Sequence, residues 1–554
     1  MRQALDKTLR SQLESAVLTA REITETACRE EIERLGIGDA SVPAFLNEAQ
    51  RKLRNRLRAH ARQLGDKLHA NGEQETAHLQ AEMAYEQWHR MLFARFLEQN
   101  NLLMYDAHTP VTLDECSELA DDEPDCASGW ELAGRLAAKM LPQVFRVDSP
   151  VLAIRLPINH QRTLEGLIMA LSPAVFEAQD SLGWCYQFWQ SKRKEEVNKS
   201  GVPIGADELS PVTQLFTEPY MVSFLLDNAL GAWWAKRRLT QDHLRHASSE
   251  QELRERAAID GVPLSYLRFV KVSAEQGELW QPAGGWYDAW ASEISELKAL
   301  DPCCGSGHFL VALFLMLVPM RMHLDGIDAS TAIERVLQQN LYGLELDGRC
   351  IEIAAFALAL EAWRFPNAGG YRPLPPLQLA CSGQDVEAAS QEWQQLAKQN
   401  PQLETALNWL KRQFKDAPVL GSLIDIKCAP YEGKAQGAPA PWQQLLDAQA
   451  QSDDESKDAS VAAQGLALAA KLLAGSYHWV ATNPPYKTKG ELNMFLQSFI
   501  EDNYPLGKSA LETVFISRCK NLLLPSGDLA LVLPQNWLFL SSYKDLRLQF
   551  QIGR

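Results

Sequence analysis

The chain contains one tetrapeptide, Asn483-Pro484-Pro485-Tyr486, whose groups could together hold a flat ring by its exocyclic amino group. It follows an apolar stretch, residues 477–481, that is typical of a buried strand. The asparagine offers a side-chain amide and the tyrosine offers a π-face. The prolines have a fixed φ, which can hold a free carbonyl pointing inward. This combination favours methyl transfer to the amino nitrogen of the ring, provided that a site for a methyl donor is also present.

A candidate site for the donor lies almost two hundred residues upstream, where the sequence has the form of a strand, a glycine turn and a helix. Gly305 and Gly307 allow the backbone to bend sharply and to approach a ligand closely. A dinucleotide-binding fingerprint would have a third glycine three residues later, which this turn lacks. Asp301, which precedes Pro302 and the turn, suits the positively charged amino group of a methionine moiety better than a pyrophosphate. The pattern therefore predicts a site for S-adenosyl-L-methionine.

Further acidic residues follow two later predicted strands. Glu345 stands at the end of the second strand, where an acidic residue takes the ribose hydroxyls in doubly wound sheets. Asp347 is the alternative for that role, and Leu346 is expected to pack on the adenine face of the cofactor. A third strand leads to Asp385, which could accept a hydrogen bond from the adenine amino group of the cofactor. An ordinary turn aspartate is a nearly equal interpretation of Asp385.

These motifs, in this order along the chain, resemble the γ class of N6-adenine DNA methyltransferases. An upstream segment that contains Phe216, Thr217 and Pro219 is similar to the first cofactor motif of that class. Residues 84–98 and 182–197 are similar to the PglX-type methyltransferases of BREX phage-defence systems. The DISARM adenine methylases and the fused restriction–methylation enzymes share much of this pattern.

The resemblance implies S-adenosyl-L-methionine as the cofactor, double-stranded DNA with a flipped adenine as the substrate, and protein partners from a defence system. Asn483 and the carbonyl of Pro484 would accept hydrogen bonds from the adenine amino group, Pro485 would help to fix the backbone, and Tyr486 would stack on the base. No metal ion is expected. The cofactor would be bound by Phe216, Thr217, Pro219, Asp301, Pro302, Gly305, Gly307, Glu345, Leu346 and Asp385.

The sequence departs from this class at two places. Ala510 stands where the class usually has an aspartate before a helix, and the chain ends at Arg554, where the class continues into a target-recognition region. We therefore expect the C-terminal end of the core and that region to be absent, or to be supplied by a separate polypeptide. Two other functions stay open: a methyltransferase for protein glutamine or ribosomal RNA, and a cofactor-binding assembly subunit without activity.

The composition is that of a globular protein, with 46% hydrophobic and 22% charged residues. The apolar run over residues 309–318 is shorter than a membrane span, and no membrane association is expected. The ten cysteines form no Cys-x-x-Cys pair, so we expect neither a zinc site nor disulfides, and a cytoplasmic location. The net charge of −16 argues mildly against DNA binding. A basic run from Arg51 to Arg62 could contact a DNA backbone, or it could be a solvated helix face.

The predicted fold class is α/β: a Rossmann-like, S-adenosylmethionine-dependent methyltransferase core with a large helical N-terminal region and a helical insertion. We expect a helical N-terminal domain over residues 1–110 and a mixed helical and loop connector over 111–205. The core would have a first part, 206–385, and a second, truncated part, 470–554. The helical insertion would lie between them, over 386–469.

Overall fold

A computed structural model gives the fold of the chain. It describes residues 4–124, 126–145, 149–213, 216–274, 277–386, 401–427, 440–447 and 457–551. Arg554, residues 214 and 215 of the upstream cofactor motif, and much of the predicted insertion lie outside the described residues.

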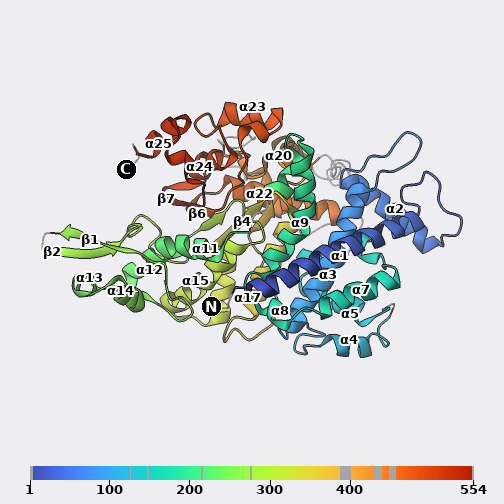
Figure 1. Cartoon of the computed structure of the whole chain (residues 1–554), viewed down its shortest axis with the longest axis horizontal. Helices are drawn as coiled ribbons and strands as arrows, with labels where there is room; N and C mark the ends of the chain where they lie inside the picture. Colours follow the sequence, from blue (N-terminus) through green and yellow to red (C-terminus); the bar gives the residue numbers. More distant parts are fainter. Residues whose placement is uncertain are drawn as a thin grey trace.

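A five-stranded parallel sheet lies at the centre of the fold (Figure 1). The chain runs from the middle strand, β3, outward through β4 to β5, and then returns to the other side of β3 to form β6 and β7. The strand order therefore reverses between β3 and β6, and ligands of such sheets bind at this point, beyond the carboxyl ends of the strands. In spatial order the strands are β5 (Leu379–Cys381), β4 (Leu341–Glu345), β3 (Ala299–Asp301), β6 (Tyr477–Thr482) and β7 (Leu523–Leu531).

Both faces of the sheet are covered along its inner strands, which explains why β3, β4 and β6 are almost fully buried. Ala299 and Trp479 belong to one hydrophobic core, whereas their neighbours Leu300 and Val480 belong to the other. The first core contains residues of α11 (Pro219–Leu226), η2 (Asp227–Gly231), α12 (Ala232–Arg238), α13 (Gln241–His246), α14 (Glu250–Ala257), α15 (His308–Asp325), α16 (Ala329–Gln339) and α17 (Gly348–Trp363). The prediction of an α/β fold with a parallel sheet is confirmed.

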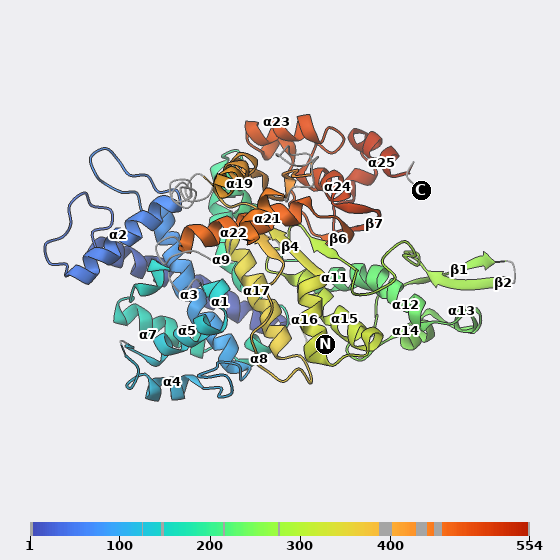
Figure 2. The same ribbon diagram turned by 180° about the vertical axis from the view of Figure 1, so that it is seen from behind.

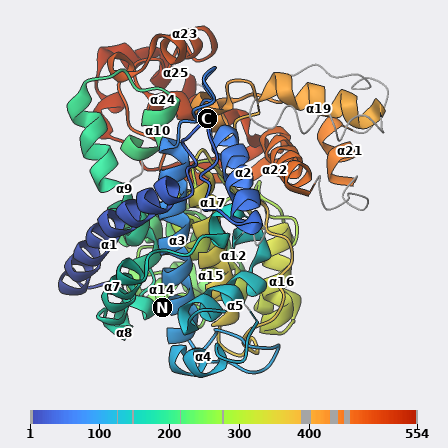
Figure 3. The ribbon, with the colours of Figure 1, turned by 90° about the vertical axis from the view of Figure 1, so that its right-hand side faces the viewer.

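The second core is built from helices that follow α9 and β5. Figure 3 shows α19, α21 and α22 beside one another at the edge of the molecule. The elements of this core are α10 (Ala206–Thr213), α19 (Pro401–Gln413), α20 (Ala417–Leu420), η3 (Gly421–Leu423), α21 (Pro441–Asp447), α22 (Lys457–Ala474), α23 (Met494–Asn503) and α24 (Leu511–Asn521). The last elements of the chain are η6 (Lys489–Glu491), η7 (Gln535–Leu538), η8 (Ser541–Tyr543) and α25 (Lys544–Gln551).

The apolar run behind the glycine turn forms part of α15, which is longer than the run itself. This helix of 18 residues is long and apolar enough to cross a membrane by length and composition alone, with a mean hydropathy of 1.4. However, 61% of it is buried inside the fold, where it packs against α16, α17 and α11. A core helix passes the same test, so this one is weak evidence for a membrane span.

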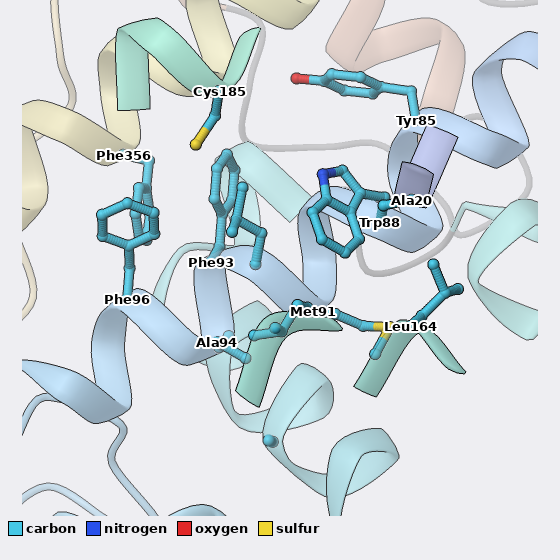
Figure 4. Packing of buried hydrophobic residues seen from close by; sticks show 14 of the residues in the cluster. Ala20, Tyr85, Trp88, Met91, Phe93, Ala94, Phe96, Leu164, Cys185 and Phe356 are labelled. Carbon is cyan, nitrogen blue, oxygen red and sulfur yellow. The ribbon is translucent and has the colours of Figure 1, made fainter. Parts of the chain in front are cut away.

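The N-terminal helices share a third core with the sheet region. Figure 4 shows Phe93 and Phe96 of α3 beside Phe356 of α17, the helix that follows β4. The rings of Phe93 and Phe356 stack with centroids 4.3 Å apart. The elements of this region are α1 (Lys7–Arg34), α2 (Glu48–Gln63), α3 (Ala77–Gln99), α4 (Leu113–Leu119), α5 (Gly129–Met140), α6 (Pro142–Phe145), η1 (Pro150–Ala153), α7 (Ile158–Met169), α8 (Pro173–Glu177) and α9 (Ser181–Ser200).

An antiparallel hairpin, β1 (Phe269–Ala274) and β2 (Gly277–Pro282), projects from the opposite end of the molecule (Figures 1 and 2). Its base is fastened to η2. Asn228 donates to the backbone carbonyl of Tyr266 and accepts the N–H of Arg268, at 2.8 and 2.9 Å. The hairpin is therefore anchored through its base.

Two arginines of the basic run on α2 have structural contacts, whereas Arg51, Lys52, Arg56 and Arg62 are exposed. Arg54 is buried and donates to the carbonyls of Gly36 and Asp39, at 2.9 and 2.6 Å. Arg58 donates to the carbonyls of Ile37 and Gly72, at 2.6 and 2.7 Å. These arginines fasten the two loops that flank α2 to the helix, so they are engaged in the fold rather than displayed to a nucleic acid.

Candidate active site

A pocket opens where the strand order reverses, beyond the carboxyl ends of β3 and β6. It is partly open, and about 460 Å³ of space, solvent at its mouth included, lies within it. Four separate parts of the chain form it: α9, the pair Phe216 and Thr217, the turn after β3 with the start of α15, and Asn483 directly after β6. Its lining residues are Gly183, Tyr186, Gln187, Phe216, Thr217, Asp301, Cys303, Cys304, Gly305, Ser306, His308, Phe309 and Asn483.

The glycine turn has the strained backbone that its sequence predicts. Gly305 and Gly307 have φ values of 51° and 85°, in the left-handed region that favours glycine. A Cβ on Gly307 would also lie 2.8 Å from the Cβ of Ala354 on α17, so the turn packs too closely for any other residue. The N–H of Gly305 donates to Oε2 of Glu345 at 2.8 Å, which fastens the turn to the end of β4.

Two buried carboxyl groups, those of Asp301 and Glu345, stand at this end of the sheet. Burial raises the pKa of Asp301 to about 7, and the nearby Glu345 carboxyl adds to the shift, although the N–H of Cys303 donates to Oδ1 at 3.1 Å. Burial also raises the pKa of Glu345, whose Oε1 accepts the N–H of Leu346 at 2.8 Å. Two neighbouring carboxyl groups that are hard to ionise favour a ligand that brings positive charge.

Asp347 has different partners, although it is only two residues from Glu345. Its Oδ2 accepts hydrogen bonds from the hydroxyls of Tyr186 and Ser210, at 2.5 and 2.7 Å. Although burial would raise its pKa, the charge of Arg349 and these hydrogen bonds hold it below the ordinary value. Asp347 therefore joins α9 and α10 to the start of α17, whereas Glu345 contacts the glycine turn.

The predicted catalytic tetrapeptide begins directly after β6. Nδ2 of Asn483 donates to Oγ1 of Thr217 at 3.0 Å. The single hydroxyl proton of Tyr486 is shared between Oδ1 of Asn483 and the carbonyl of Val532, which lies 2.8 Å from the hydroxyl oxygen. Burial and the charge of Glu512 raise the pKa of Tyr486 to about 12, so the phenol stays protonated at neutral pH. Among the described residues, no hydrogen bond reaches the carbonyl of Pro484, which is therefore able to accept one from a substrate.

Phe216 and Thr217 of the upstream motif lie between α10 and α11 in the chain and line the same pocket. The ring of Phe216 stacks on His308, with centroids 4.5 Å apart and planes at 10°. The N–H of Phe216 donates to Oε1 of Gln187 at 2.8 Å. Thr217 is 93% buried, with 7% of its surface exposed, whereas Pro219 opens α11 and does not line the pocket. Phe216 is therefore held by Gln187 and His308, and Thr217, the next residue, contacts Asn483.

The pocket has a wall that the residue types did not reveal. Gly183, Tyr186 and Gln187 lie one turn apart on a single face of α9 and line the pocket, together with Ser306 and His308. Residues 182–197 carry the family resemblance, but a glycine and a glutamine on a helix have no chemical signature of their own. The spacing of three and four residues was the one available signal.

Five predicted site residues line the pocket: Phe216, Thr217, Asp301, Gly305 and Asn483. The other nine lie outside the lining: Pro219, Pro302, Gly307, Glu345, Leu346, Asp385, Pro484, Pro485 and Tyr486. Asp385 is exposed in the loop after β5. Leu346 packs so closely against Gly383 that a Cβ on this glycine would lie 2.7 Å from Cδ1 of Leu346. The carbonyl of Pro302 accepts a hydrogen bond from Ser422 at 2.6 Å and thereby supports the turn from behind.

The lining suits a ligand with a positive charge, hydroxyl groups and a flat ring. Asp301 and the neighbouring Glu345 supply negative charge and hydrogen-bond acceptors, and the turn has no Cβ at Gly305. The ring of His308 also lines the pocket, where it stacks on Phe216. Within the part of the chain that the structure describes, no group of three or more histidine, cysteine, aspartate or glutamate residues could hold a metal ion.

Known proteins that are similar to this chain include methyltransferases. Residues 339–551 match the Eco57I restriction-modification methylase family. The chain is 25% identical over 416 residues to the adenine-specific methyltransferase PglX of Lacticaseibacillus casei (strain Zhang), and 26% identical over 434 residues to the adenine-specific methyltransferase BrxX of Escherichia coli O9:H4 (strain HS). Each alignment covers 74% of this chain and 33% of the relative. The chain thus spans about a third of the length of the curated relatives that it matches.

The predicted resemblance to the PglX-type adenine methyltransferases is therefore confirmed. Among solved structures, the chain is similar to DrdV in a complex with DNA, with a TM-score of 0.42 and 11% identity over 99% of this chain and 38% of that one. It is also similar to the type ISP restriction-modification enzyme LlaBIII bound to DNA, with a TM-score of 0.38, 10% identity, and coverage of 97% and 25%.

Proposed function

We propose that this chain is the cofactor-binding and catalytic part of a DNA adenine-N6 methyltransferase that uses S-adenosyl-L-methionine and acts in a bacterial phage-defence system. One observation carries the proposal. The tetrapeptide that begins at Asn483 and the glycine turn around Gly305 are far apart in the sequence, yet Asn483 and Gly305 line the same pocket. A donor site and an acceptor for an amino group in one pocket are what methyl transfer to nitrogen needs.

We assign the sheet to a Rossmann-like methyltransferase core, because its strand order and the position of its pocket agree with that architecture. The residues 1–110 and 111–205 would then form the helical N-terminal domain and the connector. The core would consist of residues 206–385 and 470–554, with the insertion 386–469 between them. We assign the chain to the cytoplasm, where the DNA of a bacterial cell lies.

The cofactor would be held by residues of the glycine turn and of β4. Asp301 would pair with the amino group of the methionine moiety, Glu345 would accept the ribose hydroxyls, and Leu346 would flank the adenine ring. Asp385 would require a change of its exposed loop to reach the cofactor, so it is the weakest member of the set. When bound, S-adenosyl-L-methionine supplies a methyl group that its sulfonium charge has already activated.

The residues around Asn483 would prepare the amino nitrogen of the target adenine. The adenine leaves the duplex, because its amino group cannot reach a buried pocket while it is stacked. Oδ1 of Asn483 and the carbonyl of Pro484 accept the two amino hydrogens, which draws the nitrogen lone pair out of conjugation. Pro485 fixes the backbone, and the ring of Tyr486 stacks on the base. These residues position the nitrogen, and positioning supplies most of the rate enhancement.

The DNA substrate is supported by the relatives, which are named adenine-specific methyltransferases. Because this chain spans a third of their length, we propose that a further region or a partner protein delivers the chosen adenine. The net charge of −16 agrees with DNA contacts that lie largely outside this chain.

The test is to incubate the chain with labelled S-adenosyl-L-methionine and three acceptors in parallel: bacterial DNA that lacks N6-methyladenine, ribosomal RNA and total protein. Each reaction is run alone and with candidate partner proteins. The proposal predicts label on DNA, lost in Asn483→Ala and kept in the matched control Asn503→Ala, which changes an exposed asparagine on α23. Label on RNA or protein would reject the proposal, and cofactor binding without transfer under every condition would favour an assembly subunit.

A further inference from the structure

The residues Phe216 and Thr217, which we call the strap, join the helical region to the catalytic amide. Oγ1 of Thr217 accepts the hydrogen bond from Nδ2 of Asn483 at 3.0 Å, and the threonine is buried. The strap is a direct neighbour of the predicted catalytic group, although 266 positions separate Thr217 from Asn483 in the sequence.

The other side of the strap is held by α9. Oε1 of Gln187 accepts the N–H of Phe216 at 2.8 Å. The ring of Phe216 passes so close to Gly183 that a Cβ there would lie 2.3 Å from its Cε2 atom, and its other contacts include the stacked ring of His308. A backbone hydrogen bond and a closely packed ring therefore fix the position from which Thr217 reaches Asn483.

The orientation of the Asn483 amide decides whether it can serve the proposed reaction. An asparagine side chain has a donating end and an accepting end, and a rotation by 180° exchanges them. Oδ1 accepts from the adenine amino group only if Nδ2 points the other way. Thr217 holds Nδ2, and the hydroxyl of Tyr486 contacts Oδ1. Because a carbonyl oxygen has two lone pairs, Oδ1 keeps one for the substrate.

We propose that Thr217 is a positioning residue that sets the orientation of the Asn483 amide, and that Gln187 of α9 holds Thr217 in place through the backbone of Phe216. This inference rests on the proposed function and changes the role of Thr217 within it, from cofactor ligand to support of the acceptor site. It also makes α9 part of the active site rather than part of a separate helical module.

The test compares substitutions that remove the acceptor with substitutions that keep it. Thr217→Val has nearly the same shape but no hydroxyl, whereas Thr217→Ser keeps the hydroxyl. The matched control is Thr213→Val, which removes a hydroxyl that donates to the carbonyl of Leu209 on α10, outside the pocket lining. Methyl transfer is measured with the full chain, together with the partner that gives the wild type its highest rate, and the dissociation constant of the cofactor is measured by calorimetry.

We expect Thr217→Val to lower kcat about tenfold, the effect of losing one oriented hydrogen bond in the transition state. The dissociation constant of S-adenosyl-L-methionine should stay within about twofold of the wild-type value, because Thr217 would not contact the cofactor. Thr217→Ser should restore kcat, and Thr213→Val should leave it unchanged. Gln187→Met should lower kcat in the same way, whereas Gln187→Glu, which keeps an acceptor for the N–H of Phe216, should retain it.

A Thr217→Val variant that binds the cofactor more weakly but keeps its kcat would make Thr217 a cofactor ligand and overturn the inference, while the proposed function would stand. Equal losses in Thr217→Val and Thr217→Ser would also overturn it, since the hydroxyl would then be irrelevant. A wild-type chain that transfers no methyl group to DNA with any partner would instead reject the proposed function and, with it, this inference.

Discussion

The state of Asp301 should make cofactor binding depend on pH. Its carboxyl group lines the pocket, is 1% exposed, and has a pKa raised to about 7 by burial and by the neighbouring Glu345. A ligand with positive charge binds the ionised carboxylate more tightly than the neutral acid. Binding should therefore be strong above the pKa and should weaken as pH falls through it.

The size of the effect follows from one titrating group. With a pKa of about 7, roughly half of the Asp301 carboxyls are ionised at pH 7 and about a tenth at pH 6. The association constant should therefore fall to about one-tenth of its upper limit at pH 6, and to about one-hundredth at pH 5. Glu345, whose pKa burial also raises, would steepen the fall. His308 should not interfere above pH 5, because burial lowers its pKa to about 4.

Titration calorimetry with S-adenosyl-L-methionine between pH 5.5 and 7 measures the effect, because the amino group of the ligand keeps its proton over this range. At pH 6.5, about 0.8 proton per cofactor should be released, which is visible as a dependence of the heat on the buffer. Asp301→Asn should weaken binding and flatten the pH dependence. Asp528→Asn is the matched control, since burial also raises the pKa of that carboxyl on β7, outside the pocket lining.

A cofactor affinity that stays constant between pH 5.5 and 7, without proton release, would contradict the predicted titration of Asp301 on binding. That result would mean that Asp301 is ionised in the free protein, or that it does not face the positive part of the ligand.

Three further predictions concern the packing around the pocket and the role of α2. Gly183→Ala should lower kcat/KM by at least about tenfold, because the new Cβ displaces the Phe216 ring; steady-state kinetics equal to wild type would contradict this. Tyr486→Phe keeps the ring but loses the hydroxyl that contacts Oδ1 of Asn483 and the Val532 carbonyl, so kcat should fall several-fold, about the value of one hydrogen bond, with unchanged cofactor affinity in calorimetry. Arg54→Ala should lower the free energy of unfolding, measured in urea, by about 2–3 kcal/mol without changing DNA affinity. A lower DNA affinity at unchanged stability would instead make Arg54 a DNA contact.

The sequence predicts the parts of the site whose residue types have a chemical meaning. The glycine turn could be predicted because only glycine adopts the backbone that Gly305 and Gly307 need. Asp301 and Asn483 could be predicted to share a pocket, since both follow strands and the carboxyl ends of parallel strands meet at one edge. Asp385 follows a strand in the same way, yet it is exposed and lies outside the pocket lining.

Contacts between distant parts of the chain could not be predicted in this way. Gln187 became a wall of the pocket only because α9 packs against Phe216, and nothing in an isolated helix indicates its partner. Arg54 and Arg58 belong to a run with the composition of a nucleic-acid contact, but backbone carbonyls of the flanking loops are their partners. Composition gives the charge of a side chain, whereas the fold determines which acceptor it meets.

In the proposed function, the Asn483 pocket transfers a methyl group to the amino nitrogen of adenine in DNA. The most direct test supplies the chain and its partner with S-adenosyl-L-methionine that carries a trideuterated methyl group, digests the DNA to nucleosides and analyses them by mass spectrometry. The prediction is N6-trideuteromethyl-deoxyadenosine in the wild-type reaction and none with Asn483→Ala. A deuterated methyl group on cytosine, or the same adenine product from Asn483→Ala, would contradict the claim.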